Sequence, residues 1–364
     1  MAPCPCRPSP PILPNSFSPA SSFGSQTMDS DSIRLFTTSQ GARVAQLPIT
    51  AFPGLPAWVY LVIAGDYRVL IDTGSGFGDC NQQLLAALEK ADSLLGGAGI
   101  PESLTHILIT HGHIDHFGGL PFLRKHTSAL VGVHELDLRV LTCYEERLAL
   151  VARRLNAFLT EAGVRPERRA QLLEMYLFAK RLGSSQPVDF TYQQIGMRLG
   201  PFEMLHVPGH SAGHVLIRLH DILFSGDHIL EDISPHQAPE QLTLYTGLGH
   251  YFESLARAAD WAGDVRLALG GHKEPITDLR ARVRNIRQLH EERLQTVLKA
   301  LSEPHTIAEV SKILFGKVSG YHVLLALEET GAHIEYLYQR GALRIANYSA
   351  LEEDLVPLQY VIAK

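Results

Sequence analysis

The stretch ITHGHIDHFGG, residues 109–119, concentrates metal-capable side chains at the end of an apolar segment. Three histidines and one aspartate lie within the six positions from His111 to His116, directly after the apolar run ILIT. Imidazoles and a carboxylate withdrawn from water destabilise a fold unless they are compensated, and a bound cation compensates them. We therefore expect this segment to follow a buried strand and to bind metal.

The composition is that of a large folded chain. The 364 residues are 45% hydrophobic and carry a net charge of −6, which fits one large domain and a smaller one. A mildly acidic chain has no general reason to bind nucleic acid or an anionic membrane surface, and no apolar run is long enough to predict a membrane-spanning helix. Histidine is over-represented, with 18 residues, and it is the commonest metal ligand in proteins.

Residues 1–30 are predicted to be a disordered leader. They are rich in proline and serine, and residues 1–28 contain no acidic residue and no apolar region of a secretory signal. Organellar transit peptides share this composition, but the leader has a single basic residue, so we expect a cytoplasmic protein. The cysteines are too few and too scattered for a disulfide framework: Cys4, Cys6, Cys80 and Cys143.

The rest of the chain divides into a mixed domain, 31–301, and a smaller C-terminal domain, 302–364. Short runs rich in β-branched and aromatic residues alternate with turns in the first part and return after residue 200. Between them, about residues 135–185, apolar residues recur at helical spacing and predict a helical insertion. The pattern of residues 302–364 is that of helices followed by a hairpin, which is typical of a winged helix.

The residues indicate more than one metal position. In His111-x-His113, two imidazoles point to the same side of an extended backbone and can share one ion. Asp115 and His116 follow where a helix is expected to begin, so they should face a neighbouring position. Further candidates follow later apolar strands, each beside glycine, which allows the backbone to approach a crowded centre. They are His210 in VPGHSAGH, Asp227 in SGDHIL and His272 in GGHKEPI.

These motifs, in this order, resemble those of the metallo-β-lactamase-fold hydrolases, and VLIDTG resembles the motif that precedes them in that family. The resemblance covers about residues 33–301. It implies an α+β fold, an αββα sandwich of two sheets with helices outside, and two divalent metal ions, usually zinc, with iron and manganese as alternatives.

The resemblance also implies roles for the individual residues. His111, His113 and His210 would bind the first metal. Asp115, His116 and His272 would bind the second, and Asp227 would bridge the two. Asp72 would support the site without binding metal.

The activity implied is hydrolysis by a hydroxide that bridges the two metals. We expect a small-molecule substrate with an ester, thioester or lactone bond, and Asp115 and His228 are the candidates for catalytic groups beyond metal binding. An endoribonuclease of the lactamase-like group is similar in its C-terminal extension, so an endoribonuclease or phosphodiesterase is the alternative. A binding module with a vestigial site would have lost at least one ligand, which disfavours it.

The C-terminal segment is predicted to pack rather than to bind nucleic acid. Residues 302–364 contain five basic and eight acidic side chains, a balance of −3 that should repel phosphates. Its apolar stripe, from Val323 to Leu337, is expected to be buried against the sandwich or against a second copy in a homodimer. The helical insertion is interpreted either as a solvated pair of helices or as a lid over the metals.

Overall fold

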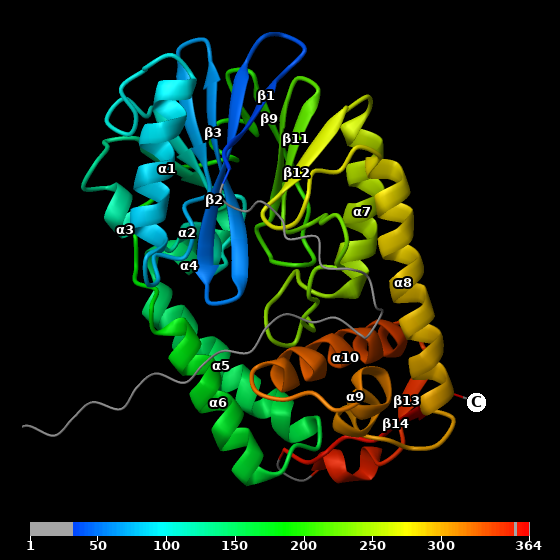
Figure 1. Cartoon of the computed structure of the whole chain (residues 1–364). Coiled ribbons are helices and arrows are strands. Elements are labelled where there is room, and N and C mark those ends of the chain that lie inside the picture. Colours follow the sequence, from blue (N-terminus) through cyan, green and yellow to red (C-terminus); the bar gives the residue numbers. More distant parts are fainter. Residues whose placement is uncertain (1–31, 353–354, 364) are drawn as a thin grey trace, which may run out of the picture.

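The computed structural model describes residues 32–352 and 355–363, so the predicted leader, residues 1–30, lies outside the described residues. Its first sheet has seven strands in the order of the sequence (Figure 1). The first four strands are antiparallel and the last three run parallel to β4. The strands are β1 (Arg34–Thr37), β2 (Arg43–Phe52), β3 (Leu55–Ala64), β4 (Tyr67–Ile71), β5 (His106–Leu108), β6 (Leu130–Val133) and β7 (Phe190–Thr191).

A second sheet of five strands faces the first, in the order β12-β11-β10-β9-β8. Its strands are antiparallel except for the parallel pair β11 and β12. The strands are β8 (Arg198–Leu199), β9 (Phe202–His206), β10 (Val215–Leu219), β11 (Ile222–Gly226) and β12 (Leu267–Gly270).

Strand β3 shows how the sequence produces the layers. Its side chains alternate between two faces, as they must in a pleated strand. Trp58 and Tyr60 point into the core between the sheets, where they pack with Phe224 of β11 and its neighbours. Val59 and Leu61 point the other way, into the core beneath α1 (Cys80–Leu94). Both faces are apolar because both are covered, so the strand is a nearly continuous apolar run.

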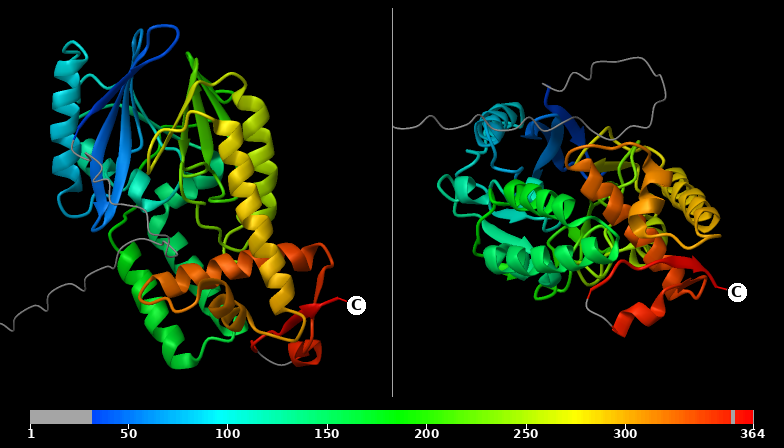
Figure 2. Two further views of the ribbon diagram at one scale, coloured as in Figure 1. Left: turned by 45° about the vertical axis from the view of Figure 1, so that its right-hand side comes forward. Right: turned by 90° about the horizontal axis from the view of Figure 1, so that it is seen from below.

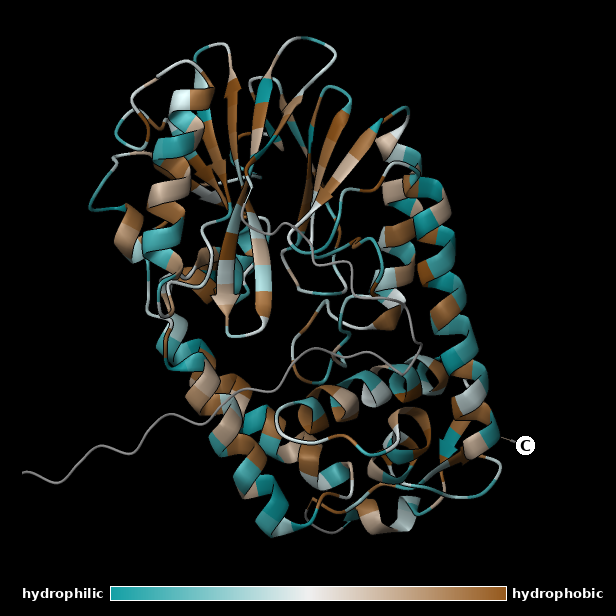
Figure 3. Cartoon of the chain, viewed as in Figure 1, coloured by the Kyte–Doolittle hydropathy of each residue, from teal (hydrophilic) through white to brown (hydrophobic). Residues whose placement is uncertain are grey.

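Helices cover the outer face of each sheet. α1, α2 (Ile114–Phe117) and α3 (Leu120–Leu123) lie on the first sheet, whereas α7 (Leu248–Ala262) and α8 (Leu279–Ala300) lie on the second (Figures 1 and 2). The predicted α+β sandwich, with two sheets inside and helices outside, is confirmed. Figure 3 shows apolar colour concentrated along the strands and a more polar outer surface on α8.

The region predicted as a helical insertion forms three helices between β6 and β7. They are α4 (Glu135–Thr142), α5 (Tyr144–Glu161) and α6 (Pro166–Lys180). In Figure 1, α5 and α6 extend beyond one end of the sandwich and approach the C-terminal helices.

The C-terminal segment contains the predicted helices and hairpin, but it does not have a core of its own. It comprises α9 (Ile307–Phe315), α10 (His322–Gln339), β13 (Leu343–Ile345), the 3-10 helix η1 (Tyr348–Glu352) and β14 (Tyr360–Ile362). The expected apolar stripe on α10 is buried within the chain, in one cluster with side chains of α5, α7 and α8. The winged-helix designation and the exact domain limits stay predictions.

No helix in the described residues is both long enough and apolar enough to cross a membrane.

Phe158 is a suitable probe of the contact between the insertion and the C-terminal helices. Its ring is fully buried on α5 and lies against Gly331 of α10, where an added Cβ would meet the ring at 2.8 Å. Phe158→Ala should therefore lower the free energy of unfolding by about 3–5 kcal/mol, through lost burial and a cavity. Phe178→Ala, on a side chain of α6 that is 55% exposed, should change it by less than about 0.5 kcal/mol. Urea unfolding would measure both; equal effects would contradict a shared core.

Candidate metal centre

The candidate ligands lie where strands of both sheets end. Asp72 follows β4, and the loop with His111 and His113 follows β5, whereas Asp227 follows β11 and His272 follows β12. β4 pairs in parallel with β5, and β11 pairs in parallel with β12, so the loops after each pair emerge at the same edge of its sheet. The structure thus brings together all seven residues predicted as ligands, although they come from four separate segments of the chain.

Three imidazoles form a first group of potential ligands. One ring nitrogen from each of His111, His113 and His210 lies within 4.8 Å of the others. The ring centres of His111 and His113 are 4.6 Å apart, and that of His210 is 4.6 Å from His113. This is the set that the resemblance assigns to the first metal.

Two carboxylates and two imidazoles form the second group. It consists of Asp115, His116, Asp227 and His272. His272 Nε2 lies 3.4 Å from Asp115 Oδ2 and 3.4 Å from Asp227 Oδ2. Donor atoms that share a tetrahedral zinc ion at about 2.1 Å lie roughly 3.4 Å apart, so these separations fit a common ion.

Asp227 lies between the two groups. Its Oδ2 is 3.4 Å from His116 Nε2 in the second group and 4.0 Å from His210 Nε2 in the first. Its Oδ1 is buried and has no hydrogen-bond partner within the described residues. Asp227 Oδ2 is therefore within 4.0 Å of a ligand nitrogen in each group, which fits a carboxylate shared between the two positions.

The imidazoles are held so that one ring nitrogen faces the centre. His210 Nδ1 donates to the carbonyl of His236 at 2.8 Å, and His272 Nδ1 donates to that of Pro56 at 2.7 Å. The other ring nitrogen, Nε2, is buried in three of the candidate ligands and has no hydrogen-bond partner among the described residues. These ligands are His111, His116 and His210. Buried nitrogens without partners are destabilising, whereas metal-binding histidines have this arrangement of an oriented Nδ1 and an available Nε2. The residues therefore fit a metal.

Asp72 orients the ligand-bearing loop after β5 at two points, Thr110 and His116. Its Oδ2 accepts from His116 Nδ1 at 2.8 Å and from the hydroxyl of Thr110 at 2.8 Å, and its Oδ1 accepts from the Thr110 amide. Thr110 Oγ1 in turn lies 3.1 Å from His111 Nδ1. Asp72 has a φ of 62°, a strained conformation for a residue other than glycine, which these hydrogen bonds offset. Its supporting role agrees with the expectation from the resemblance.

The electrostatics differ between the two groups. In the first, burial lowers the pKa of His111 and His113 well below the usual value, and the neighbouring imidazoles add to the effect. In the second, burial also opposes charging, but Asp227 and Asp115 outweigh it and raise the pKa of His272 to about 10. Without metal, protons on the second group compensate the carboxylates. A cation that binds there has to displace them, so metal binding and protonation compete.

Glycine permits the tight approach at this centre. A Cβ on Gly271 would lie 2.6 Å from Asp227 Oδ1 and 2.6 Å from His116 Cε1. Any side chain at this position would therefore displace two of the candidate ligands, which explains why a glycine precedes His272.

Three further residues support the site: Asp137 and His214 are buried and His236 is partly buried, and sequence reasoning missed Asp137 and His236. Asp137 of α4 accepts from the amides of Gly112 and Gly213, which joins the two loops that bear the first group. His214 Nε2 accepts from the Asp227 amide at 3.1 Å. The third is His236, whose carbonyl holds His210. In the sequence, His214 stands out only as part of the motif VPGHSAGH, and His236 only as part of the run SPHQ. Neither pattern indicates that His214 contacts Asp227 or that His236 contacts His210.

His228 lies behind the ligands. Its ring is fully buried and contacts the rings of His214 and Tyr251, with ring centres 5.5 and 4.9 Å away. Tyr251 donates its hydroxyl proton to the His228 carbonyl. His228 is thus separated from the first group by His214, which stacks on His111, and its catalytic role stays a prediction without geometric support.

The comparisons with known proteins agree with this geometry. The chain is 28% identical over 246 residues to the lactamase-like protein adaB of Aspergillus niger, which covers 66% of this chain but only 57% of adaB. It is 25% identical over 296 residues to the probable metallo-hydrolase YqjP of Bacillus subtilis, which covers 78% of this chain and 88% of YqjP.

A solved structure with a similar fold is the metallo-beta-lactamase family protein TTHA1429 of Thermus thermophilus. Its TM-score is 0.67 at 26% identity, and the match covers 88% of this chain and 98% of that one. A family model described as the metallo-beta-lactamase superfamily matches residues 52–296, about two thirds of the chain. The predicted family is therefore confirmed, and the chain belongs to the metallo-beta-lactamase superfamily.

Proposed function

We propose that this protein is a binuclear metal-dependent hydrolase of a small molecule with an ester, thioester or lactone bond. One observation carries the proposal: two adjacent groups of donors meet at Asp227, and in His111, His116 and His210 the buried Nε2 atom has no hydrogen-bond partner among the described residues. A complete donor set in a family of hydrolases favours catalysis over a vestigial site.

The residues divide the work between two ions. His111, His113 and His210 would bind one, Asp115, His116 and His272 the other, and Asp227 both. When bound, two divalent cations supply Lewis acidity and lower the pKa of water to near neutrality. Zinc suits the mixture of imidazole and carboxylate ligands, and iron or manganese are alternatives. Asp72 and the carbonyls of Pro56 and His236 keep the imidazoles in the tautomer that binds metal.

The surroundings of the site suit a small substrate. Lys180 of α6 and Tyr321, the residue before α10, lie close enough to Asp115 for its charge to affect their pKa values, although burial is the larger effect for both. The insertion and the C-terminal segment therefore each bring a side chain within electrostatic range of Asp115, and a substrate pocket formed by both segments is part of the proposal. Both side chains are partly buried, which favours a bounded pocket over an open groove for a polymer.

One observation supports the alternative function, a nuclease or phosphodiesterase: the surface of the C-terminal segment is less acidic than its composition suggests. Glu328 and Glu329 are only 8% and 5% exposed, so two of the eight acidic residues counted against nucleic acid do not face solvent. The exposed surface is thus less acidic than the sequence predicted, and Arg340 and Arg344 are exposed. Against this, α10 is buried along most of its length and does not present a face that could enter a groove.

A substrate panel tests the proposal. Metal-free protein reloaded with zinc would be assayed on lactone, thioester, phosphodiester and RNA substrates, with Asp227→Ala as the background. We expect turnover of a carbonyl ester or lactone. Turnover of RNA or a phosphodiester alone would favour the rival function.

Metal analysis should give close to two ions per chain. The two donor groups are of similar quality, so each should retain an ion through purification. His113→Ala should reduce the content by weakening the first position, and His272→Ala should reduce it by weakening the second. His126→Ala, on a histidine remote from the groups, should keep both ions. A single ion in the saturated wild-type chain would contradict the binuclear assignment.

Asp227→Ala should lose one ion and nearly all turnover. The change removes a negative charge shared by two cations, so the repulsion between them rises. We expect a loss of roughly 10³-fold in kcat, which is about 4 kcal/mol of transition-state stabilisation. Steady-state kinetics and metal analysis of the same preparation would measure both effects. Full activity in this variant would show that Asp227 does not bridge.

Nucleic-acid binding by the C-terminal segment should be weak. Its basic residues are few and α10 is buried, so few phosphates can be neutralised and few counterions released. Fluorescence anisotropy with single-stranded RNA and duplex DNA at physiological salt should show no appreciable binding. Micromolar RNA binding with a steep salt dependence would contradict this and would favour the endoribonuclease.

A further inference from the structure

A buried polar cluster lies where α10 passes the loop after β11. The cluster joins that loop to α10 and α8. Its members are His236 and Gln237 of the loop, Glu328, Glu329 and His333 of α10, and His290 and Arg293 of α8. In the apolar junction between the sandwich and the C-terminal helices, such a cluster is destabilising unless every group has a partner.

The carboxylates of Glu328 and Glu329 on α10 contact both the side chain of His236 and the backbone amide that follows it. His236 Nε2 lies 2.8 Å from Glu328 Oε2, and His236 Nδ1 lies 3.5 Å from Glu329 Oε2. The next amide, of Gln237, donates to Glu329 Oε2 at 2.7 Å. The side chain of His236 and the peptide that follows it are therefore fixed to the same helix turn.

The same residue, His236, reaches the metal centre through its backbone. Its carbonyl accepts from Nδ1 of His210, the one member of the first group that does not come from the loop after β5. The path from α10 to a candidate ligand thus has two steps, carboxylate to His236 and His236 to His210, each with a hydrogen bond of 2.8 Å.

The cluster does not need a cation of its own. His290, Glu329 and His333 lie close enough together to bind one. However, Glu329 already pairs with Arg293 at 2.8 Å, and His290 Nδ1 lies 3.1 Å from His333 Nε2. Glu328 pairs with His236 and Glu329 with Arg293, so each carboxylate already has a partner within the chain. We therefore assign the cluster a positioning role.

We propose that Glu328 and Glu329 are positioning residues for the metal centre: they fix His236, whose carbonyl keeps His210 turned with Nε2 toward the first group. The proposal rests on the proposed binuclear function and adds that the C-terminal segment completes the site. Without the two carboxylates the loop relaxes and His210 can rotate, which weakens the first ion. The second ion keeps its support, because His116 and His272 are oriented by Asp72 and the Pro56 carbonyl.

The test is a metal titration of the full chain. Metal-free wild type and the double variant Glu328→Gln with Glu329→Gln would be titrated with Zn²⁺ against a chromophoric chelator, and with Co²⁺ followed by its absorption bands. Loss of an outer hydrogen-bond partner typically lowers metal affinity by about 10–100-fold. We expect that loss for one ion only, the ion that His210→Ala also removes, with the other ion unchanged.

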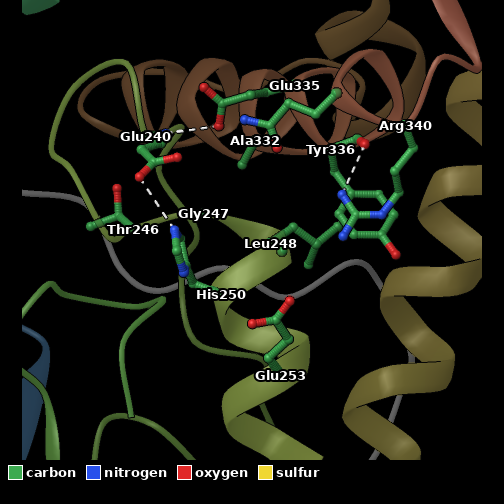
Figure 4. Close-up of a pocket in the computed structure, with 12 residues that line it drawn as sticks. Glu240, Thr246, Gly247, Leu248, His250, Glu253, Ala332, Glu335, Tyr336 and Arg340 are labelled. Atoms are coloured by element: carbon green, nitrogen blue, oxygen red, sulfur yellow. Dashed lines mark hydrogen bonds and ion pairs between the residues drawn. The ribbon is translucent and has the colours of Figure 1, made fainter. Parts of the chain in front are cut away.

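Glu335→Gln is the matched control. Glu335 is on the same helix and also accepts from a loop, through the amides of Glu240 and Gln241, but neither of these bonds reaches a candidate ligand (Figure 4). Its metal affinities should equal those of the wild type. The single variant Glu328→Gln should have a smaller effect than the double variant, because Glu329 still holds the Gln237 amide.

The two proposals fail separately. If the titration of the wild type finds only one bound ion, the binuclear function is contradicted. The positioning role is then tested by asking whether the double variant lowers the affinity for the ion that His210→Ala removes. Unchanged affinity for that ion overturns the positioning role. Equal weakening of both ions together with a lower melting temperature also overturns it, because that result indicates general loosening of the junction.

Discussion

The buried negative charge of Asp227 is the constraint on which this site depends. The residue is 8% exposed and directly follows strand β11, and its carboxylate shares its surroundings with Asp115 and Asp72. Three carboxylates in such a small volume repel one another, and burial removes the water that would screen them. The neighbouring imidazoles compensate them, either by holding protons or by sharing cations. Metal binding and the folded arrangement of these loops are therefore energetically linked.

The sandwich makes that arrangement possible because it fixes the loops on both sides. Parallel pairing of β4 with β5 and of β11 with β12 places the ligand-bearing segments at adjacent edges before any metal is bound. Asp72 and Asp137 then join neighbouring loops through backbone amides. A pre-formed set of donors loses little conformational entropy on binding, so more of the binding free energy is retained. The hydrogen bonds that Asp72 makes to Thr110 and His116 in this arrangement also offset the strain of its backbone conformation.

Local features of the site could be predicted from the sequence, and non-local ones could not. The spacing of His111, His113, Asp115 and His116 predicts two groups of candidate ligands, and the structure contains two such groups, because side-chain direction along a few residues follows from backbone geometry. The strands were recognisable from their composition, and β3 shows why. By contrast, Asp137 has the pattern of an ordinary polar residue of an amphipathic helix, and no spacing relates it to Gly112 or Gly213. His228 shows the reverse error, since adjacency to Asp227 in sequence does not bring its ring to the ligands.

The C-terminal segment illustrates the limit of charge counting. In the sequence, Glu328 and Glu329 count toward an acidic surface that would repel phosphates, yet both are inside the molecule and face His236 and Arg293. Adjacent glutamates on a helix are ordinarily solvated, and burying them needs two cationic partners from elsewhere in the chain. Such a pair adds little stability compared with apolar residues of similar size, but it fixes direction and register. The junction ends on His210, a candidate metal ligand, and a fixed direction at this point agrees with the proposed positioning role of Glu328 and Glu329.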